Sequence, residues 1–341
     1  MSAPLKQLDA LWRRGREFLG TDYALMGGAM TWLSERNLVS SLSNAGGFGV
    51  IACGAMTPDL LDREIEATAV LTEKPFGVNL ITMHPELEDL IDICLKHQVG
   101  HIILAGGLPG KPPIKQVKDG GAKVVCFAPT LGLAKRLIRQ GADALVIEGA
   151  EAGGHIGPVA TSILAQEILP HIDEVPVFIA GGIGRGDAVV SYLEMGASGC
   201  QLGTLFVCAT ESIAHVNFKK AFIRASARDA VPSVQLDPQF SVIPVRALQN
   251  DATRDFQATQ RDVIDAFGRG EIDLTEARLK IEHFWAGALR RAVVDGDVET
   301  GSLMAGQSVG MVREEKPVAD IISDLLAEAV DALTAREHHP D

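Results

Sequence analysis

The sequence predicts an α/β fold, a (β/α)8 TIM barrel with a helical insertion near the C-terminus. Eight short apolar runs alternate with longer amphipathic stretches between residues 24 and 210. The runs are almost continuous in Val, Ile, Leu, Phe and Ala, which is typical of parallel strands buried on both faces. Eight strands that are each followed by a helix favour a barrel. A doubly wound open sheet is the alternative, because the number of strands alone does not show closure.

The apolar runs give the positions of the expected strands. Each run ends in glycine or a polar residue, which indicates the point where the chain leaves the sheet. In chain order, the expected strands are Ala24–Met30, Phe48–Cys53, Phe76–Leu80, His101–Ala105, Lys123–Phe127, Ala144–Ile147, Val175–Ala180 and Gly199–Gly203.

The stretches between these runs have the spacing of amphipathic helices. In Pro85–His97, apolar side chains at positions 87, 90, 91 and 94 fall on one face and acidic side chains on the other. Leu131–Gln140 and Gly186–Met195 show the same pattern. Gly141 and Gly196 follow the last two stretches, at the position where a left-handed helix cap is favoured. These stretches therefore predict the helices that connect the strands.

The rhythm changes after residue 208, and this change sets the expected domain organisation. We expect residues 1–234 and 301–341 to form the barrel, and residues 235–300 to form a helical insertion that covers its mouth. Val231–Asn250 holds several prolines and predicts irregular structure, whereas Asp251–Arg291 predicts helices packed on the barrel. Pro317–Arg336 has the pattern of an amphipathic terminal helix.

Charge and composition narrow the classes of partner. The net charge is −13 and the sequence holds no run of Lys and Arg, which argues against nucleic acid and against an anionic membrane surface. The five cysteines form no CxxC pair, and no His/Cys cluster has the spacing of a metal site. No apolar run approaches about 18 residues. We expect a cytoplasmic protein that acts on a small-molecule substrate and binds no metal. A homodimer is one assembly that the sequence allows.

Two neighbouring strand ends near residue 200 predict a phosphate-binding site. The seventh expected strand ends in Gly181 and Gly182, and the eighth in Gly203 and Thr204. In barrels, the loops after strands 7 and 8 commonly bind phosphate through backbone N–H groups. Tight turns are the competing explanation for each glycine pair, but two such loops at adjacent strand ends favour a ligand site.

The loop after the sixth strand is the most informative stretch of the chain. Glu148–Gly157 holds four glycines, two glutamates and His155, with too few apolar side chains to belong to a core. A histidine in such a loop at the mouth of a barrel is well placed to act as an acid, a base or a hydrogen-bond donor. The alternative is a histidine in an ordinary surface loop.

The ends of the first and third strands add further candidates. Ala29 and Met30 lie where small residues let a flat ring approach the backbone, and Trp32 follows them. Met30 has core packing as its competing role. Asn79 ends the third strand, where its amide can bind the edge of a cofactor or cap the next helix. The sequence contains no Rossmann fingerprint, P-loop or GxSxG elbow.

Taken together, these blocks resemble the nitronate monooxygenase (2-nitropropane dioxygenase) family. The similarity is closest to its flavin-dependent enoyl-ACP reductase II branch, and it covers most of residues 22–312. The blocks that carry it are Gly28–Trp32, Asn44–Gly49, Lys74–Asn79, Glu148–Gly157, Ala180–Ile183, Gly203–Thr204, Gly287–Arg290 and Gly301–Gln307.

The resemblance implies a barrel with tightly bound FMN and His155 as the catalytic residue. Gly301–Gln307 would form part of the substrate wall, and we expect Trp32, Met304 and Gln307 to contact the substrate. The residues expected at the FMN are Ala29, Met30, Asn79, Glu148, Gly153, Gly154, Gly181, Gly182, Gly203 and Thr204.

Three reactions are compatible with these motifs. The first, which the sequence analysis favours, is oxidation of alkyl nitronates with O2, as the name of the family implies. The second is reduction of an enoyl-ACP or a quinone-like acceptor, with NAD(P)H as a co-substrate. The third, from a different class, is a flavin-free phosphate-binding barrel that acts as an isomerase or aldolase. The first two share every motif in the sequence, because the motifs report contacts with the flavin and not with the substrate.

Overall fold

A computed structural model describes residues 2–54 and 56–338 of the chain. Its main sheet has eight parallel strands in the order β1-β9-β8-β6-β5-β4-β3-β2. The two outer strands meet, because Met26 and Phe48 form a parallel bridge and the Gly27 N–H donates to the Phe48 carbonyl at 2.8 Å. The sheet therefore closes, which confirms the barrel over the open sheet.

Seven of the eight barrel strands agree with the predicted runs to within two residues, and β1 ends three residues before its predicted run does. Parallel pairing buries both of their faces, so their apolar composition was a sufficient signal. Their bounds are β1 Leu25–Gly27, β2 Gly49–Ala52, β3 Phe76–Ile81, β4 His101–Ala105, β5 Lys123–Phe127, β6 Ala144–Glu148, β8 Val177–Ala180 and β9 Gly199–Leu202.

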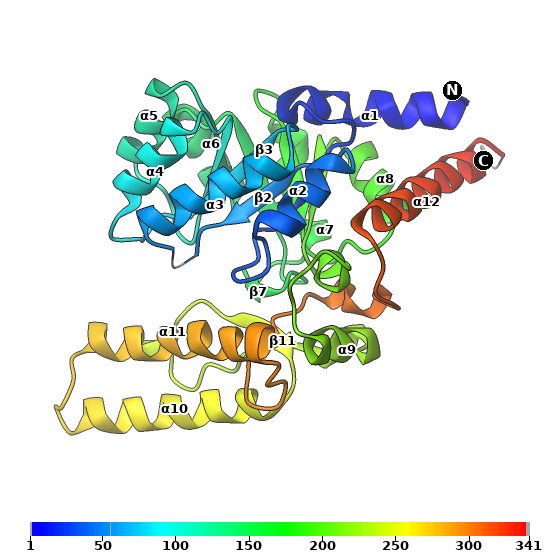
Figure 1. The fold of residues 1–341 in the computed structure, drawn as a ribbon. Helices are drawn as coiled ribbons and strands as arrows, with labels where there is room; N and C mark the ends of the chain where they lie inside the picture. Colours follow the sequence, from blue (N-terminus) through cyan, green and yellow to red (C-terminus); the bar gives the residue numbers. More distant parts are fainter. Residues whose placement is uncertain (1, 55, 339–341) are drawn as a thin grey trace.

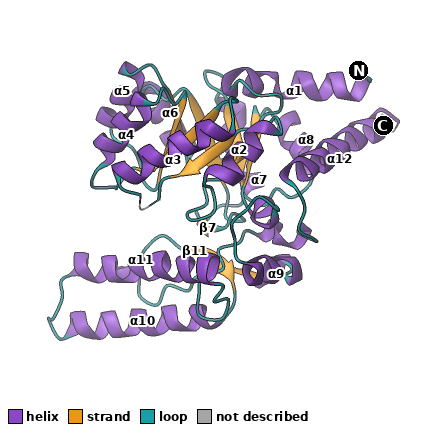
Figure 2. Cartoon of the chain, in the orientation of Figure 1, coloured by secondary structure: helices purple, strands orange, loops and turns teal. Residues whose placement is uncertain are grey.

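Helices surround the barrel (Figures 1 and 2). The terminal helices α1 and α12 lie beside each other, and α12 also packs along α8. The predicted helix Leu131–Gln140 is observed with the same bounds, and Gly141 caps it with a φ of 110°. The helices are α1 Ala3–Leu19, α2 Arg36–Asn44, α3 Pro58–Leu71, α4 Leu87–Lys96, α5 Lys111–Asp119, α6 Leu131–Gln140, α7 Thr161–Ile168, α8 Gly186–Glu194, α9 Val216–Arg224 and α12 Val318–His338.

A second, smaller layer lies against the mouth of the barrel. Figure 1 shows the paired helices α10 (Asp251–Gly268) and α11 (Leu274–Arg290) below the barrel, as a hairpin with its own buried core. The strands β10 (Ala230–Pro232) and β11 (Val245–Leu248) join this hairpin to the barrel, because β11 pairs with β7 (Gly154–His155) in the loop after β6.

The structure differs from the sequence prediction in this connecting layer. Val231–Asn250 was expected to be irregular, but β11 lies inside it and β10 begins just before it. Both strands are three or four residues long, and β11 pairs with β7, which lies about 90 positions earlier in the chain. The expected boundary between residues 234 and 235 falls between β10 and β11, which are hydrogen-bonded to each other. No helix in the described part of the chain is long and apolar enough to cross a membrane.

Candidate active site

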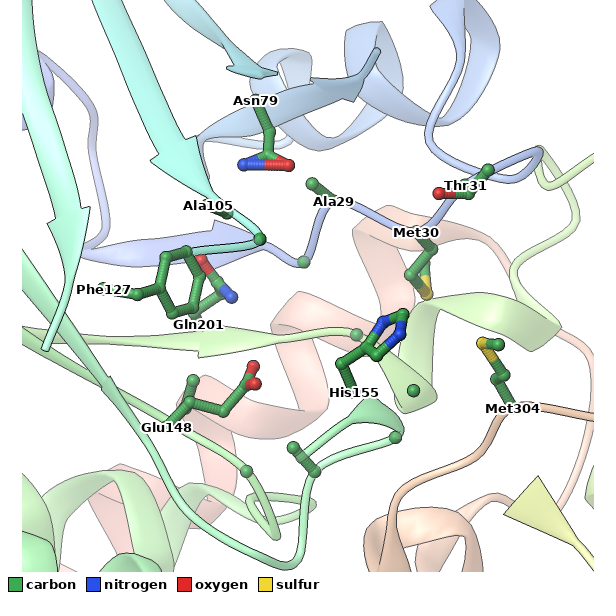
Figure 3. A pocket seen from close by; sticks show the side chains of 18 of the residues that line it. Ala29, Met30, Thr31, Asn79, Ala105, Phe127, Glu148, His155, Gln201 and Met304 are labelled. Carbon is green, nitrogen blue, oxygen red and sulfur yellow. The ribbon is translucent and has the colours of Figure 1, made fainter. Parts of the chain in front are cut away.

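A cavity of about 480 Å³ opens at the carboxyl ends of the barrel strands. Its walls come from the ends of β1, β3, β4, β5, β6, β8 and β9 and from the insertion. Figure 3 shows Asn79, Gln201 and Glu148 pointing into it from strand ends, with the His155 ring nearer to Met30 and Met304. Active sites of barrel enzymes lie at this end, so the cavity is the candidate site.

Most of the predicted site residues line this cavity. They include the histidine, the strand-end glycines and one of the three residues expected at the substrate. Their contacts with a ligand remain predictions. The predicted residues that line the cavity are Ala29, Met30, Asn79, Glu148, Gly153, Gly154, His155, Gly181, Gly182, Gly203, Thr204 and Met304.

Two residues expected at the substrate lie outside the cavity lining. Trp32 adopts a left-handed φ of 69° and is 41% exposed, and the Arg290 guanidinium carbon lies 5.9 Å from the centroid of its ring. Gln307 begins a 3-10 turn and its N–H donates to the Glu151 carbonyl at 2.9 Å. Neither the left-handed turn at Trp32 nor this hydrogen bond was visible in the sequence, and contact of the two residues with a substrate stays a prediction.

Glycine at two strand ends keeps the floor of the cavity open. A Cβ on Gly28 would lie 3.1 Å from the Gly203 Cα, so a side chain there would require the end of β9 to shift by a few tenths of an ångström. Gly181 has a φ of 96°, and its Cβ would lie 3.1 Å from the Gly149 carbonyl oxygen. The floor is therefore backbone, with N–H groups available to an anionic ligand.

Three of the polar side chains that line the cavity come from the barrel strands. Burial raises the pKa of the Glu148 carboxyl from 4.5 to about 8, so the group is largely protonated at neutral pH. Asn79 is 6% exposed and donates from Nδ2 to the Ile103 carbonyl at 3.3 Å. Gln201 lines the cavity between the buried residues Cys200 and Leu202.

Gln201 is a site residue that the sequence analysis missed. The available signal was an amide in an apolar strand, two residues before the glycine that ends it. Among the described residues, neither Gln201 nor Glu148 has a side-chain hydrogen bond to another group of the protein. A polar side chain without a partner in the protein gives up no internal hydrogen bond when a ligand binds to it. Both side chains are therefore candidates for hydrogen bonds to the edge of a cofactor.

His155 lies on the short strand β7, at the junction of the barrel and the insertion. Its Nε2 is 2.7 Å from Glu282 Oε1 on α11, and the two side chains are 47% and 35% exposed. The backbone of this loop is held by the pairing of His155 with Val245 and by the Ile156 N–H, which donates to the Pro244 carbonyl at 2.9 Å. The insertion therefore fixes the position of the predicted catalytic loop.

Two further side chains hold this loop from the inside. Arg246 is 7% exposed and donates from Nε to the Ala150 carbonyl at 2.8 Å. The Glu151 carboxylate accepts from the Thr161 N–H at 2.9 Å and from its hydroxyl at 2.8 Å. Glu151 thus ties the loop to the start of α7, and of the two glutamates in the loop only Glu148 faces the cavity.

Few ionisable side chains line the cavity. Among the described residues that line it there is no Lys or Arg, and Glu148 and His155 are the members with ionisable side chains. The outer part is apolar and includes Ile243, Leu289 and Met304. The site therefore suits a ligand with a flat, mostly neutral body, whose anionic group is bound by backbone N–H groups.

Comparisons with known proteins agree with this arrangement. Residues 14–92 and 87–328 match the family described as nitronate monooxygenase. The chain is 27% identical over 347 residues to (3aS,4S,5R,7aS)-5-hydroxy-7a-methyl-1-oxo-octahydro-1H-indene-4-carboxyl-CoA dehydrogenase from Rhodococcus jostii (strain RHA1), covering 94% of this chain and 96% of that protein.

Two solved structures extend the comparison. FabK from Thermotoga maritima is 35% identical, with a TM-score of 0.85 over 96% of this chain and 98% of FabK. A nitroalkane oxidase from Streptomyces ansochromogenes is 26% identical, with a TM-score of 0.75 over 92% of this chain and 98% of the oxidase. Both similarities span the barrel and the insertion together.

Proposed function

Starting from the fact that the chain belongs to the nitronate monooxygenase family, we propose that it is an FMN-dependent reductase of an enoyl thioester, with NAD(P)H as the reductant. The family and the relatives indicate an oxidoreductase of the flavin type. The cofactor and the substrate are the proposal. It places the flavin on the glycine floor of the cavity and the thioester beside His155.

The sparse charge of the cavity is the observation that carries this proposal. A nitronate is an anion before it reacts, so it needs a cationic partner in the ground state, and transfer from water without one is costly. His155 is the one side chain in the described lining that can supply positive charge, and Glu282 balances it. A thioester is neutral when it binds and gains negative charge on its oxygen only during hydride addition. A single donor is then most effective in the transition state.

The residues present fit a flavin. The unpartnered Gln201 amide and Glu148 carboxyl and the Asn79 amide would meet the polar edge of its ring. The backbone at Gly181 and Gly203 would meet its phosphate. When bound, FMN would supply the hydride chemistry between NAD(P)H and the β-carbon of the enoyl thioester.

The protein's own groups then act on the thioester. A ring N–H of His155 donates to the carbonyl oxygen and stabilises the charge that grows there. The apolar side chains of Ile243, Leu289 and Met304 hold the acyl chain and exclude water from it. The proton that completes the α-carbon comes from solvent at the open mouth. These residues therefore orient and polarise the substrate.

The similar proteins support a thioester as the substrate. FabK, an enoyl-ACP reductase II, has the higher identity and TM-score of the two structures compared above. The Rhodococcus relative is named for a carboxyl-CoA compound. Nitronate oxidation is the second candidate, because it is the reaction for which the matching family is named.

Product analysis separates the two candidates. The purified holoprotein is incubated with NADPH or NADH and crotonyl-CoA without O2, and the products are weighed by mass spectrometry. We expect butyryl-CoA, two hydrogens heavier than the substrate. A parallel incubation with propyl nitronate and O2 is assayed for nitrite. Nitrite formation without any saturated thioester would overturn the proposal in favour of nitronate oxidation.

A further inference from the structure

We propose that Glu282, on helix α11 of the insertion, is a positioning residue that holds the His155 ring for catalysis. The inference rests on the proposed function, in which His155 donates to the substrate oxygen. It begins with the 2.7 Å contact between His155 Nε2 and Glu282 Oε1, which joins residues 127 positions apart. The contact is the point where a side chain of the helical hairpin meets the predicted catalytic residue.

Helix α11 holds the Glu282 carboxylate in a fixed position. The neighbouring residue Ile281 is fully buried and Trp285, one turn further on, is 3% exposed. Both belong to the hairpin core with Phe256, whose ring centroid lies 4.4 Å from that of Trp285. Glu282 therefore projects from a packed helix, and its reach towards the cavity is set by the hairpin core.

The contact decides which nitrogen of His155 faces the substrate. A carboxylate accepts, so Nε2 is the donor in this pair and Nδ1 is the nitrogen left for the substrate. In the neutral ring with its proton on Nε2, Nδ1 carries no proton, so donation from Nδ1 to the thioester oxygen requires the doubly protonated ring, whose charge the Glu282 carboxylate balances. A carboxylate that orients a catalytic histidine in this way is a recurring device in enzymes.

Without Glu282 the ring would lose this constraint. The His155 side chain is 47% exposed and sits in a loop rich in glycine, so few contacts limit its rotation. The pair adds little to folding, because both partners are partly exposed and solvent screens them. A variant at Glu282 should thus fold normally and lose activity.

The first experiment measures the two half-reactions of the holoprotein by anaerobic stopped flow. We expect Glu282→Ala to slow reoxidation of the reduced flavin by crotonyl-CoA about tenfold, below the roughly 10²–10⁴-fold typical of removing an acid–base group itself. Reduction by NADPH should be unchanged. Glu282→Gln keeps an acceptor oxygen without the charge and should fall between wild type and Glu282→Ala. Equal loss in both half-reactions would contradict a positioning role.

A double-mutant cycle with a matched control tests whether Glu282 acts through His155. In a His155→Ala background, Glu282→Ala should cause no further loss. Additive losses would overturn the proposal. Glu276→Ala is the control, because Glu276 is an exposed acid on the same helix whose carboxylate contacts Lys280 at 3.3 Å. It should leave both half-reactions as in wild type.

A readout without substrate keeps this inference separate from the proposed function. Long-range ¹H–¹⁵N NMR reports which ring nitrogen of a histidine carries the proton, and His155→Ala identifies the signal. We expect the Nε2–H form for His155 in wild type and a mixture of tautomers in Glu282→Ala. An unchanged signal in Glu282→Ala would refute the contact even if crotonyl-CoA is a substrate. A changed signal would support it even if the substrate is different.

Discussion

The two sides of the cavity are built in different ways. On the barrel side, the surface combines backbone and small residues at strand ends with a few polar side chains from the strands, and a buried core that includes Phe48, Val78 and Phe178 sets their positions. On the insertion side, it is made of larger side chains such as His155 and Met304, held by contacts with distant segments. The barrel side fits a fixed, flat cofactor, and the insertion side fits a variable substrate.

This difference suggests that cofactor binding and substrate choice are separable in the molecule. The barrel core and the hairpin core are distinct groups of buried residues. Changes on one side should therefore alter flavin content with little effect on the chemistry of His155, and changes on the other side should do the reverse. Four variants test this separation.

Removing the His155 ring should have the largest effect on turnover. His155→Ala lowers turnover by about 10²–10⁴-fold, because the substrate oxygen loses its donor. The flavin stays bound, since the floor of the cavity is unchanged. Turnover and the flavin absorbance of the same sample check both halves of this expectation. Full turnover in the variant would remove His155 from catalysis.

Filling the cavity floor should release the flavin. In Gly28→Val the new side chain meets the Gly203 Cα, which a Cβ alone would approach to 3.1 Å. Overpacking costs about 1–3 kcal/mol, and this corresponds to a roughly 5- to 150-fold weaker affinity. Flavin titration of the apoprotein measures it. Gly132→Ala is the control, because Gly132 lies in α6 with open space at its Cβ position. Equal FMN affinity in Gly28→Val and wild type would show that the flavin does not bind against Gly28.

A cavity in the hairpin core should loosen the insertion and spare the barrel. Phe256 is fully buried there, and Phe256→Ala destabilises its surroundings by about 3–5 kcal/mol. Amide hydrogen exchange should accelerate in α10 and α11 but not in the barrel strands. Flavin content should remain that of wild type, and turnover should fall less than in His155→Ala. Faster exchange throughout the barrel would show that the two cores unfold together.

The smallest effect concerns stability at different pH values. The folded-state pKa of Glu148 is raised from 4.5 to about 8 by burial, so its protonated form is favoured in the folded protein. Its contribution to stability is complete below about pH 4.5 and is lost as the pH rises through about 8. Urea unfolding of the flavin-free protein should show this decline, and Glu148→Gln should remove it. The same pH dependence in the variant would place the titration on another group.

The sequence predicted the barrel side well for a physical reason. Strands buried on both faces must be apolar throughout, and a closely approached backbone requires glycine, so both features are local. Gly181 and Gly203 were identified this way, and both line the cavity. Gln201 carried a similar local signal, a polar residue in an apolar strand, which the sequence analysis did not use.

The insertion side depends on contacts that local patterns do not encode. Glu282 meets His155 across 127 positions, and β11 finds its partner in β7. Nothing in the helical pattern of Asp251–Arg291 marks Glu282 among the other exposed acids. Trp32 was assigned to the substrate by its position in a motif, but it has a left-handed φ of 69° and does not belong to the cavity lining.

The central claim is that this cavity holds a flavin that passes hydride from a nicotinamide to a thioester. One anaerobic absorbance experiment tests it directly, with the purified protein mixed first with NADPH or NADH and then with crotonyl-CoA. We expect a yellow protein that the nicotinamide bleaches and the thioester restores. A yellow protein that a nitronate bleaches and neither nicotinamide bleaches would contradict the proposal that the protein is a reductase. A colourless protein that does not take up FMN would contradict the cofactor.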